Sequence, residues 1–146
     1  MVAGWLTDPE FSLYIGGVRD RDQVRGMFDR WQAHRQEHGF GPMGVVDKAT
    51  GRLIGRSGLA YHPSWPADPE AGWWIIPEFQ GRGLATEAGA RSIEWAFGPL
   101  GYSRVTSICL EGATPSRAVM AKLGFSLHTR VPSDWGELLI HLRDRA

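Results

Sequence analysis

The stretch Gly72–Phe97 constrains the fold of this chain most, because it combines a strand, a glycine turn and a helix in direct succession. Trp73–Ile76 is a run of bulky aromatic and β-branched residues, which is typical of a buried strand. Pro77 ends that strand, since proline cannot donate to a continuing ladder. From Gly83 onward small and apolar residues recur at helical spacing, which predicts a helix that lies close to a sheet.

The turn between this strand and helix has the composition of an anion-binding loop. Gln80–Ala85 reads Gln-Gly-Arg-Gly-Leu-Ala. Glycines at positions 81 and 83 allow backbone N–H groups to converge, and the helix start adds free amides and a positive dipole end. Arg82 adds a charged donor. The loop predicts a phosphate or pyrophosphate site, although glycine turns between a strand and a helix more often serve only as turns.

Two common phosphate motifs are excluded. A nucleoside-triphosphate loop requires Gly-Lys-Ser/Thr, and a dinucleotide fold requires G-x-G-x-x-G with an acid about 20 residues later. Neither motif accompanies this loop. Another class of phosphate ligand is therefore expected.

Composition excludes several other classes. With 146 residues, 42% of them hydrophobic, and seven tryptophans, the chain is expected to form a single folded domain over 1–146. Lys plus Arg equals Asp plus Glu at 16 each, so no basic field favours nucleic acid. Cys109, the sole cysteine, excludes an intramolecular disulfide and fits inert packing in a reducing compartment. No apolar run is long enough to cross a bilayer and no signal peptide is evident, so we expect a cytoplasmic protein without a membrane partner.

Hydrophobic periodicity predicts the remaining elements. Residues 20–38 form an amphipathic helix with a capping box at Asp20 and Gln23 and a stop at Gly39. Strands at 43–47 and 53–61 form a hairpin around Gly51, and the proline-rich segment 62–69 is expected to be a loop. A strand at 105–110 runs parallel to the one before the glycine loop, because a helix connects them. A helix from Pro115 to Gly124 and an antiparallel pair at 126–131 and 137–143 complete an α/β (α+β) fold with a mixed, mostly antiparallel sheet.

The block around the glycine loop resembles the acetyl-CoA site of the GNAT superfamily of N-acetyltransferases. The family signature Gln/Arg-x-x-Gly-x-Gly/Ala is filled by Gln80, Gly83 and Ala85. Glu-Ala-Gly-Trp-Trp at 70–74 and Ala-Thr-Glu-Ala at 85–88 resemble the branch of ribosomal-protein N-terminal acetyltransferases of RimJ/RimL type. Lys-Leu-Gly-Phe at 122–125 also matches the family.

Two features depart from the family pattern. The asparagine that usually precedes the helix serine holds Ala113 here, whereas Ser116 occupies the serine position. Relatives also carry a strand and most of a helix before the position at which this chain begins. An edge without that strand tends to recruit a partner or to be covered by its own chain, so we expect short N-terminal helices over the core distal to CoA, and a homodimer. The apolar residues available for this cover are Trp5, Leu6, Phe11, Leu13, Tyr14 and Ile15. The alternatives are a monomer whose helix from Asp20 shields the edge, or a start placed too late.

The resemblance implies an acetyl-CoA-dependent N-acetyltransferase that acts on a primary amine by direct attack in a ternary complex, with no metal. It implies that the splayed parallel strands receive the pantetheine arm. The residues expected to contact the cofactor are Trp74, Ile75, Ile76, Gln80, Gly81, Arg82, Gly83, Leu84, Ala85, Ser116 and Lys122. The residues expected to contact the acceptor are His62, Trp65 and Trp73, although His62 and Trp65 fit a purely covering role equally well.

The chemistry of acetyl transfer suggests a role for several of these residues. Glu70 is the expected general base, with His62 and Glu111 as rivals, although a solvated carboxylate at a strand start is the simpler interpretation. A bulge at the strand end would make the N–H of residue 75 or 76 an oxyanion donor. Ser116 either protonates the leaving thiolate or only caps its helix.

Two other functions are compatible with the sequence. The first is a non-catalytic acyl-CoA-binding or scaffold protein on the same fold, which Ala113 favours. The second is an unrelated enzyme that uses the glycine loop for another phosphate ligand. The acceptor is open among peptide N-termini and small-molecule amines, because loops build that part of the site.

Overall fold

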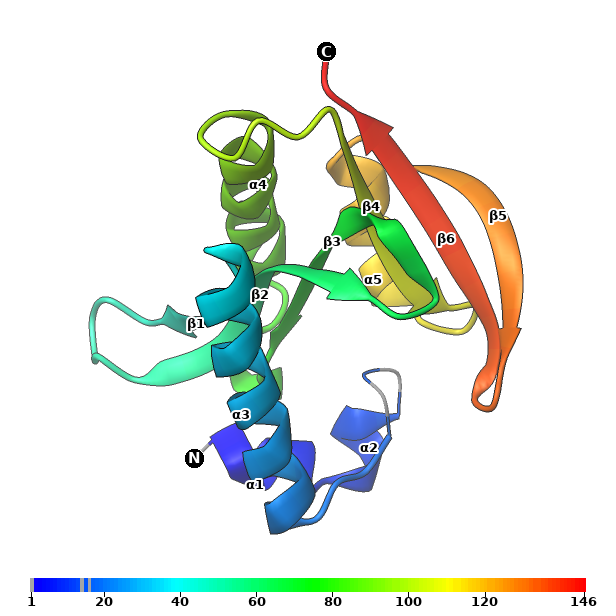
Figure 1. The fold of residues 1–146 in the computed structure, drawn as a ribbon. Helices are drawn as coiled ribbons and strands as arrows, with labels where there is room; N and C mark the ends of the chain where they lie inside the picture. The colour runs from blue at the N-terminus through cyan, green and yellow to red at the C-terminus, as the bar shows by residue number, and fades with distance from the viewer. Residues whose placement is uncertain (1, 14, 16) are drawn as a thin grey trace.

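The structure is a computed structural model that describes residues 2–13, 15 and 17–146, and its sheet is mixed and mostly antiparallel (Figure 1). The strand order is β1-β2-β3-β4-β6-β5, and only β3 and β4 run parallel. This confirms the predicted fold class. The elements in chain order are α1 (Val2–Leu6), α2 (Pro9–Ser12), α3 (Arg21–His38), β1 (Pro42–Val46), β2 (Leu53–His62), β3 (Trp65–Ile75), the 3-10 turn η1 (Pro77–Phe79), α4 (Leu84–Phe97), β4 (Arg104–Leu110), α5 (Thr114–Lys122), β5 (Ser126–Ser133) and β6 (Gly136–Asp144).

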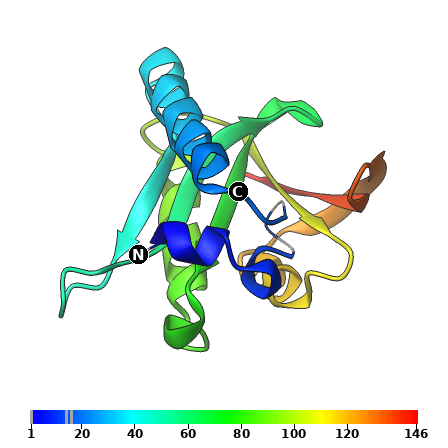
Figure 2. The same ribbon diagram turned by 90° about the horizontal axis from the view of Figure 1, so that it is seen from below.

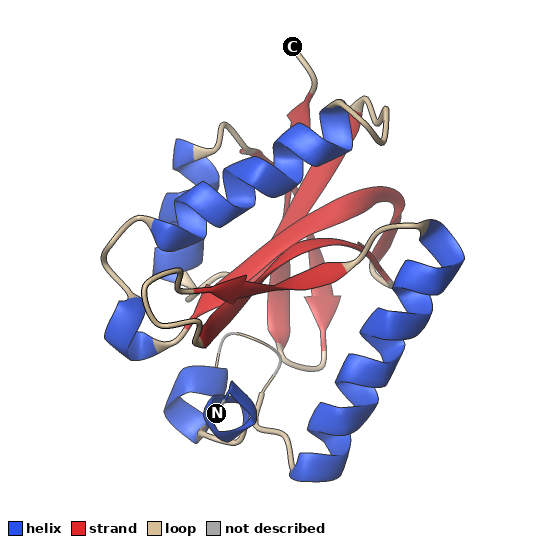
Figure 3. Ribbon diagram, turned by 90° about the vertical axis from the view of Figure 1, so that its left-hand side faces the viewer, coloured by secondary structure: helices blue, strands red, loops and turns tan. Residues whose placement is uncertain are grey.

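Helices cover both faces of the sheet. Figure 3 shows α4 and α5 on one side and α3 on the other, with the two N-terminal helices beyond one end of the strands. Side chains of β3 alternate between these layers, as a pleated strand requires. The main core lies under α4 and α5 and includes Leu59, Ala71, Ile93, Ala96, Val105 and Leu139. None of the helices in the described residues is long and apolar enough to span a membrane.

Helix α3 begins and ends as predicted. The Asp20 carboxylate accepts from the Gln23 N–H, while the Gln23 side chain accepts from the Asp20 N–H. Gly39 ends the helix in the left-handed conformation with a φ of 77°. Val24 and Met27 are buried beneath it. The hairpin β1–β2 is also confirmed, and Gly51 in its turn has a φ of 71°.

The predicted loop at 62–69 is wrong. β2 continues to His62 and β3 begins at Trp65, so that only two residues form the turn. The β2–β3 register shifts between Tyr61 and His62, opposite this segment. Pro66 and Pro69 therefore lie inside or beside a place where the regular ladder is already interrupted, and a missing proline N–H is tolerated there.

The parallel strands β3 and β4 are joined by one register pair, Glu70 with Thr106. The Ser107 hydroxyl adds a bond to the Ala71 carbonyl at 2.9 Å. Further along β3 no ladder pair to β4 follows within the described residues. Backbone groups on the β4 side of residues 73–75 therefore lack a partner in β4.

The N-terminal helices are short, as expected, but their location differs from the prediction. Leu6 packs with Val24 and Met27 of α3, and Phe11 packs edge-on against Trp74 with ring centroids 5.7 Å apart. The helices also line a cavity next to the glycine loop instead of covering a core remote from it. Leu13, expected to provide cover, is exposed, and Tyr14 lies outside the described residues.

Candidate active site

The cavity at the end of β3 has a volume of about 760 Å³ and combines residues from four parts of the chain. Figure 2, viewed from this end, shows α1 and α2 in front of the strand end and α5. The N-terminal helices contribute Trp5, Asp8, Glu10, Phe11 and Ile15; β3 and η1 contribute Trp73, Trp74, Ile75, Pro77 and Phe79; the loop and α4 contribute Gln80, Gly81, Gly83, Leu84, Ala85 and Thr86; and the segment around α5 contributes Ala113, Pro115, Ser116, Val119 and Lys122. Its size fits a ligand site.

The glycine loop has the conformation that an anion cradle requires. Gly81 and Gly83 each have a φ of 75°, a conformation that residues with a side chain rarely adopt. Gly83 is the N-cap of α4, and no side chain caps the free amides there. A Cβ at either glycine would meet nothing within 4 Å, so the glycines are needed for backbone conformation and not for space. The loop and the helix N-terminus together fit a pyrophosphate.

Gln80 and Arg82 differ in where their side chains lie. The Gln80 amide donates to the Ile75 carbonyl at 2.8 Å, which ties the loop to the end of β3. The Arg82 guanidinium donates to the Glu78 carbonyl at 3.2 Å and lies over the Phe79 ring, 4.8 Å from its centroid. Gln80 thus lines the cavity and stabilises its shape, whereas Arg82 is not among the lining residues.

Backbone hydrogen bonding distinguishes the two expected oxyanion donors, the N–H groups of Ile75 and Ile76. The Ile76 N–H donates to the Ile54 carbonyl at 2.9 Å, which excludes it as an oxyanion donor, and its side chain is buried. Antiparallel ladders alternate, so the N–H of Ile75 points to the other side, toward the gap beside β4. The Ile75 carbonyl shares that side, as its bond from Gln80 shows. The expected bulge is absent, because the β2–β3 register is regular from Gly55 to Tyr61.

Ser116 and Lys122 both line the cavity from α5. The Ser116 hydroxyl makes no hydrogen bond to another described residue and does not cap the helix. Ser116 thus lies inside the first turn of α5 and not at its N-cap position, and its role as a proton donor stays a prediction. Ala113 occupies the N-cap position, where its side chain is buried and contributes no hydrogen bond.

Trp73 and Trp74 point to opposite faces of β3. Trp73 is buried against Gly89 of α4 and Phe125, and only its edge reaches the cavity. Trp74 points toward α3 and the N-terminal helices. It lines this cavity and also a second one between α3 and the β1–β2 hairpin.

Glu70 shares the Trp74 face of β3, at the point where β3 and β4 pair, and it is not among the residues that line the cavity. Burial raises the pKa of its carboxyl to about 7, although the Arg56 charge and the backbone N–H of Ile108 oppose that rise. Glu70 lies inside β3 and is half-buried, so it is not a fully solvated carboxylate at a strand start. A group with this pKa can accept a proton near neutral pH.

The other expected residues lie away from this cavity. The Trp65 indole donates to Asp68 at 3.2 Å and packs on His128. Trp65 pairs with His62, six residues along β2 from the partner of Trp74, which places the two tryptophans roughly 20 Å apart. His62 accepts from the Ser64 N–H at 3.0 Å, and burial lowers its pKa. Glu111 pairs with Arg130 at 3.1 Å. His62, Trp65 and Glu111 are not among the residues that line the cavity.

Sequence reasoning missed the part of the cavity that the N-terminal helices form. Trp5, Glu10 and Phe11 line the cavity from helices too short to show a periodic pattern. Arg56 was missed as well, although it stands opposite Trp74 in the β2–β3 register. Its guanidinium lies over the Trp31 ring, 5.3 Å from the centroid. An arginine within an otherwise apolar strand was the available signal.

Comparison with known proteins gives a family match and several relatives. The chain matches the model of the "Acetyltransferase (GNAT) domain" over residues 1–126. It is 41% identical over 56 residues to the putative ribosomal N-acetyltransferase YdaF of Bacillus subtilis (strain 168), covering 38% of this chain and 31% of that protein. The chain thus spans about a third of this relative's length.

Solved structures share the fold over nearly the whole chain. The acetyltransferase from Agrobacterium tumefaciens str. C58 is 28% identical with a TM-score of 0.87, covering 98% of this chain and 82% of that one. Spermidine N-acetyltransferase from Vibrio cholerae, solved with CoA and spermine, is 14% identical with a TM-score of 0.78, covering 98% and 87%. Since the family model covers most of its residues, the chain belongs to the GNAT acetyltransferase family.

Proposed function

We propose that this protein transfers the acetyl group of acetyl-CoA to a primary amine by direct attack in a ternary complex. One observation supports this most: a single cavity joins the glycine loop, the strand end with its free Ile75 N–H, and the unbonded Ser116 hydroxyl. Acetyl transfer needs an anion site, an oxyanion donor and a proton donor near one another. The acceptor amine is then expected on the side formed by the N-terminal helices.

The cofactor-binding residues divide by the part of acetyl-CoA they would hold. Backbone amides of Gly81–Ala85 suit the pyrophosphate, and Lys122 is in reach of a phosphate from the opposite wall. The gap between β3 and β4 suits the pantetheine arm, since the backbone of residues 73–75 can bond there as a strand edge would. The Ile75 N–H then stabilises the oxyanion that develops on the thioester carbonyl.

Glu70 and Ser116 are the proposed proton-transfer residues. The pKa of Glu70, about 7, lets its carboxylate take a proton from the attacking amine, directly or through water. Ser116, which lines the cavity, passes a proton to the leaving thiolate and takes one back from water, so that the serine ends neutral and CoA leaves as the free thiol. Amines with a pKa near 8, such as peptide α-amines, need less help from a base than a lysine at about 10.4. The RimJ/RimL-like resemblance and the name of the relative YdaF make a peptide N-terminus one candidate acceptor, beside small-molecule amines.

A non-catalytic acyl-CoA-binding protein is the second candidate. Ala113 favours it, because its buried methyl group replaces a family amide that could bond in the cavity. Titration of acetyl-CoA by calorimetry, followed by measurement of free thiol release over a panel of amines, separates the two. Binding with thiol release supports the enzyme. Binding without release from any amine supports the second candidate, and no binding contradicts both.

Self-association is proposed as a homodimer through the outer edge of β1. No other described strand pairs with that edge, and Val46 on β1 is exposed. Unpaired edges with apolar side chains tend to recruit another copy. Light scattering of the protein as given should report twice the monomer mass, whereas a clean monomer at 16.2 kDa would contradict the dimer.

A further inference from the structure

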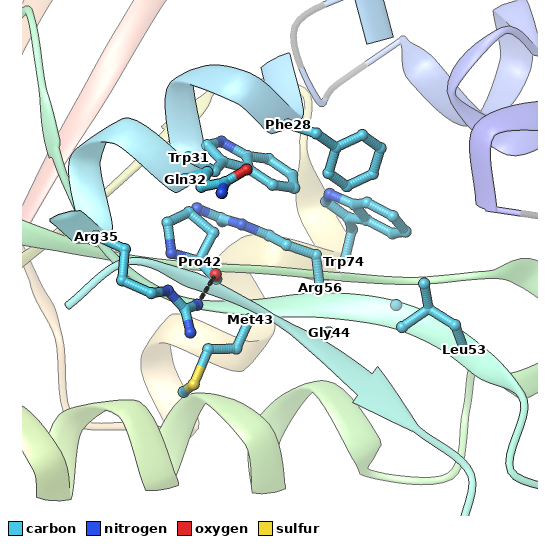
Figure 4. Close-up of a pocket in the computed structure, with 11 residues that line it drawn as sticks. Phe28, Trp31, Gln32, Arg35, Pro42, Met43, Gly44, Leu53, Arg56 and Trp74 are labelled. Carbon is cyan, nitrogen blue, oxygen red and sulfur yellow. Dashed lines mark hydrogen bonds between the residues drawn. The ribbon is translucent and has the colours of Figure 1, made fainter. Parts of the chain in front are cut away.

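A second cavity lies between α3 and the β1–β2 hairpin, with a volume of about 590 Å³ (Figure 4). Trp74 lines both this cavity and the candidate active site, so the two are neighbours across one side chain. The walls are mainly aromatic and aliphatic, and the charged residues among them are two arginines without any carboxylate. The lining residues are Phe28, Trp31, Gln32, Arg35, Pro42, Met43, Gly44, Leu53, Gly55, Arg56 and Trp74.

Arg56 is the unusual group in this cavity. Its guanidinium makes no hydrogen bond to a described residue, and its Nε is buried without a partner. Figure 4 shows the side chain running beneath Trp31 and Gln32 from the strand that carries it. Arg35, in contrast, donates to the Pro42 carbonyl at 2.6 Å and is already engaged. A nitrogen buried without a hydrogen-bond partner is costly, so a ligand that accepts from this half-buried guanidinium would bind favourably.

The strand beneath Arg56 fixes where that charge lies. Nη1 packs onto Gly72, where a Cβ would collide with it. Gly72 stands between Glu70 and Trp74 on the same face of β3. The positive charge is therefore held between the proposed general base and the tryptophan that separates the two cavities. The Glu70 charge acts on Arg56 electrostatically, and no salt bridge among the described residues joins the two.

We propose that this second cavity binds the carboxylate and apolar body of the acceptor, which makes the acceptor an amino-carboxylic acid with an aromatic or branched apolar side chain. Arg56 binds the carboxylate through its planar donors, which match carboxylate geometry. Phe28, Trp31 and Trp74 contact the apolar body. The amine then extends past Gly72 toward Glu70. This inference names the acceptor class and rests on the proposed acetyl transfer.

Exposure of the rim agrees with a site that fills on binding. Phe28, Met43 and Leu53 are exposed by 40%, 41% and 42%, although all three are apolar and border the same cavity. Burial of such side chains by a ligand is favourable at about 25 cal/mol per Å². The positive charge of Arg56 favours a carboxylate ligand over an apolar protein partner in this cavity, because an apolar partner would leave the guanidinium without a hydrogen-bond acceptor.

The test uses two ligands that carry no amine and cannot be acetylated: 3-phenylpropanoate and its carboxamide. NMR titration of the ¹⁵N-labelled protein follows the indole N–H signals of Trp31 and Trp74. We expect the acid to bind at least about tenfold more tightly than the amide, since charged hydrogen bonds are the stronger ones. Arg56→Gln should abolish this preference. The control Arg25→Gln removes an exposed charge from α3, the helix that lines the same cavity, and should keep the preference.

Two results would overturn the site. Equal binding of acid and amide by the wild-type protein is one, and a preference that survives Arg56→Gln is the other. If Arg56→Gln does not fold by circular dichroism, Arg56→Lys replaces it and should weaken the acid but not the amide, because a point charge replaces a fork. An acid that leaves both indole signals unmoved in a protein that is dimeric by light scattering would make this face an interface instead.

Turnover distinguishes failure of the site from failure of the proposed function. Thiol release is compared for phenylalanine and phenylalaninamide, with acetyl-CoA saturating. Release from both amines without preference for the acid refutes the carboxylate site and leaves acetyl transfer standing. Selective binding of phenylpropanoate without thiol release from any amine refutes acetyl transfer and leaves the site standing.

Discussion

The proposed cofactor side and the proposed acceptor side, which lie in two neighbouring cavities, are built from different parts of the protein. Backbone builds the cofactor side, through two left-handed glycines, the amides of α4 and the N–H of Ile75. Side chains build the acceptor side, from the N-terminal helices, α3 and β2. Binding of a ligand by backbone N–H groups depends on the dihedral angles of the loop and tolerates substitution of most nearby side chains. Side-chain binding changes with each substitution, so one scaffold can keep its cofactor and change its acceptor.

The largest expected effect comes from the backbone side. Gly83→Val should weaken acetyl-CoA binding by about a hundredfold or more, because a β-branched residue is strongly disfavoured at a φ of 75° and the amides turn away. Gly51→Val is the matched control, since Gly51 also has a positive φ, of 71°, with no neighbour around its Cβ position. It should lower the melting temperature similarly and leave CoA affinity intact. Calorimetry and thermal melts measure both, and equal CoA affinity in both variants contradicts the cradle.

The next effect lies where the two sides meet. Ser116→Ala should lower kcat about ten- to a hundredfold with little change in KM for acetyl-CoA, because a thiolate proton donor acts in the transition state. Ser126→Ala, an exposed serine of β5, is the control and should keep full activity. Steady-state kinetics decide between the roles. A rise in KM at constant kcat would make Ser116 a binding residue only.

Glu70 gives a pH-dependent effect of intermediate size. Activity should rise with pH as the carboxyl ionises around its pKa of about 7, and Glu70→Gln should flatten this acidic limb of kcat/KM. If the limb survives, another group is the base. Stability shifts in the opposite direction: the folded pKa exceeds the unfolded value of about 4.3, so folding loses stability as pH rises from about 4.5 to 7. Glu70→Gln should therefore raise the melting temperature more at pH 8 than at pH 5.

The sequence predicted the backbone side well and the acceptor side poorly, for physical reasons. The glycines at positions 81 and 83 indicate a requirement for positive φ angles, which the sequence alone reveals. The position of the Arg56 side chain, in contrast, depends on its contacts with Gly72 and Trp31. Strand pairing and helix packing bring these residues together, and neither can be read from the sequence. Trp65 was expected beside the acceptor, because a proline-rich loop could bring it there. Pairing of β2 with β3 instead places it at the start of β3, far from Trp74.

Arg82 should have the smallest effect of the residues around the loop, and it separates backbone from side-chain recognition within the cofactor side itself. Its guanidinium lies over Phe79 and bonds the Glu78 carbonyl, so acetyl-CoA does not need it for the cradle. Arg82→Ala should weaken acetyl-CoA by less than about threefold at moderate salt, because an exposed charge contributes little at a distance. The residual effect should vanish on raising the salt concentration, as measured by calorimetry at two ionic strengths. A loss as large as that of Gly83→Val would mean that the side chain turns to the phosphate when the cofactor binds.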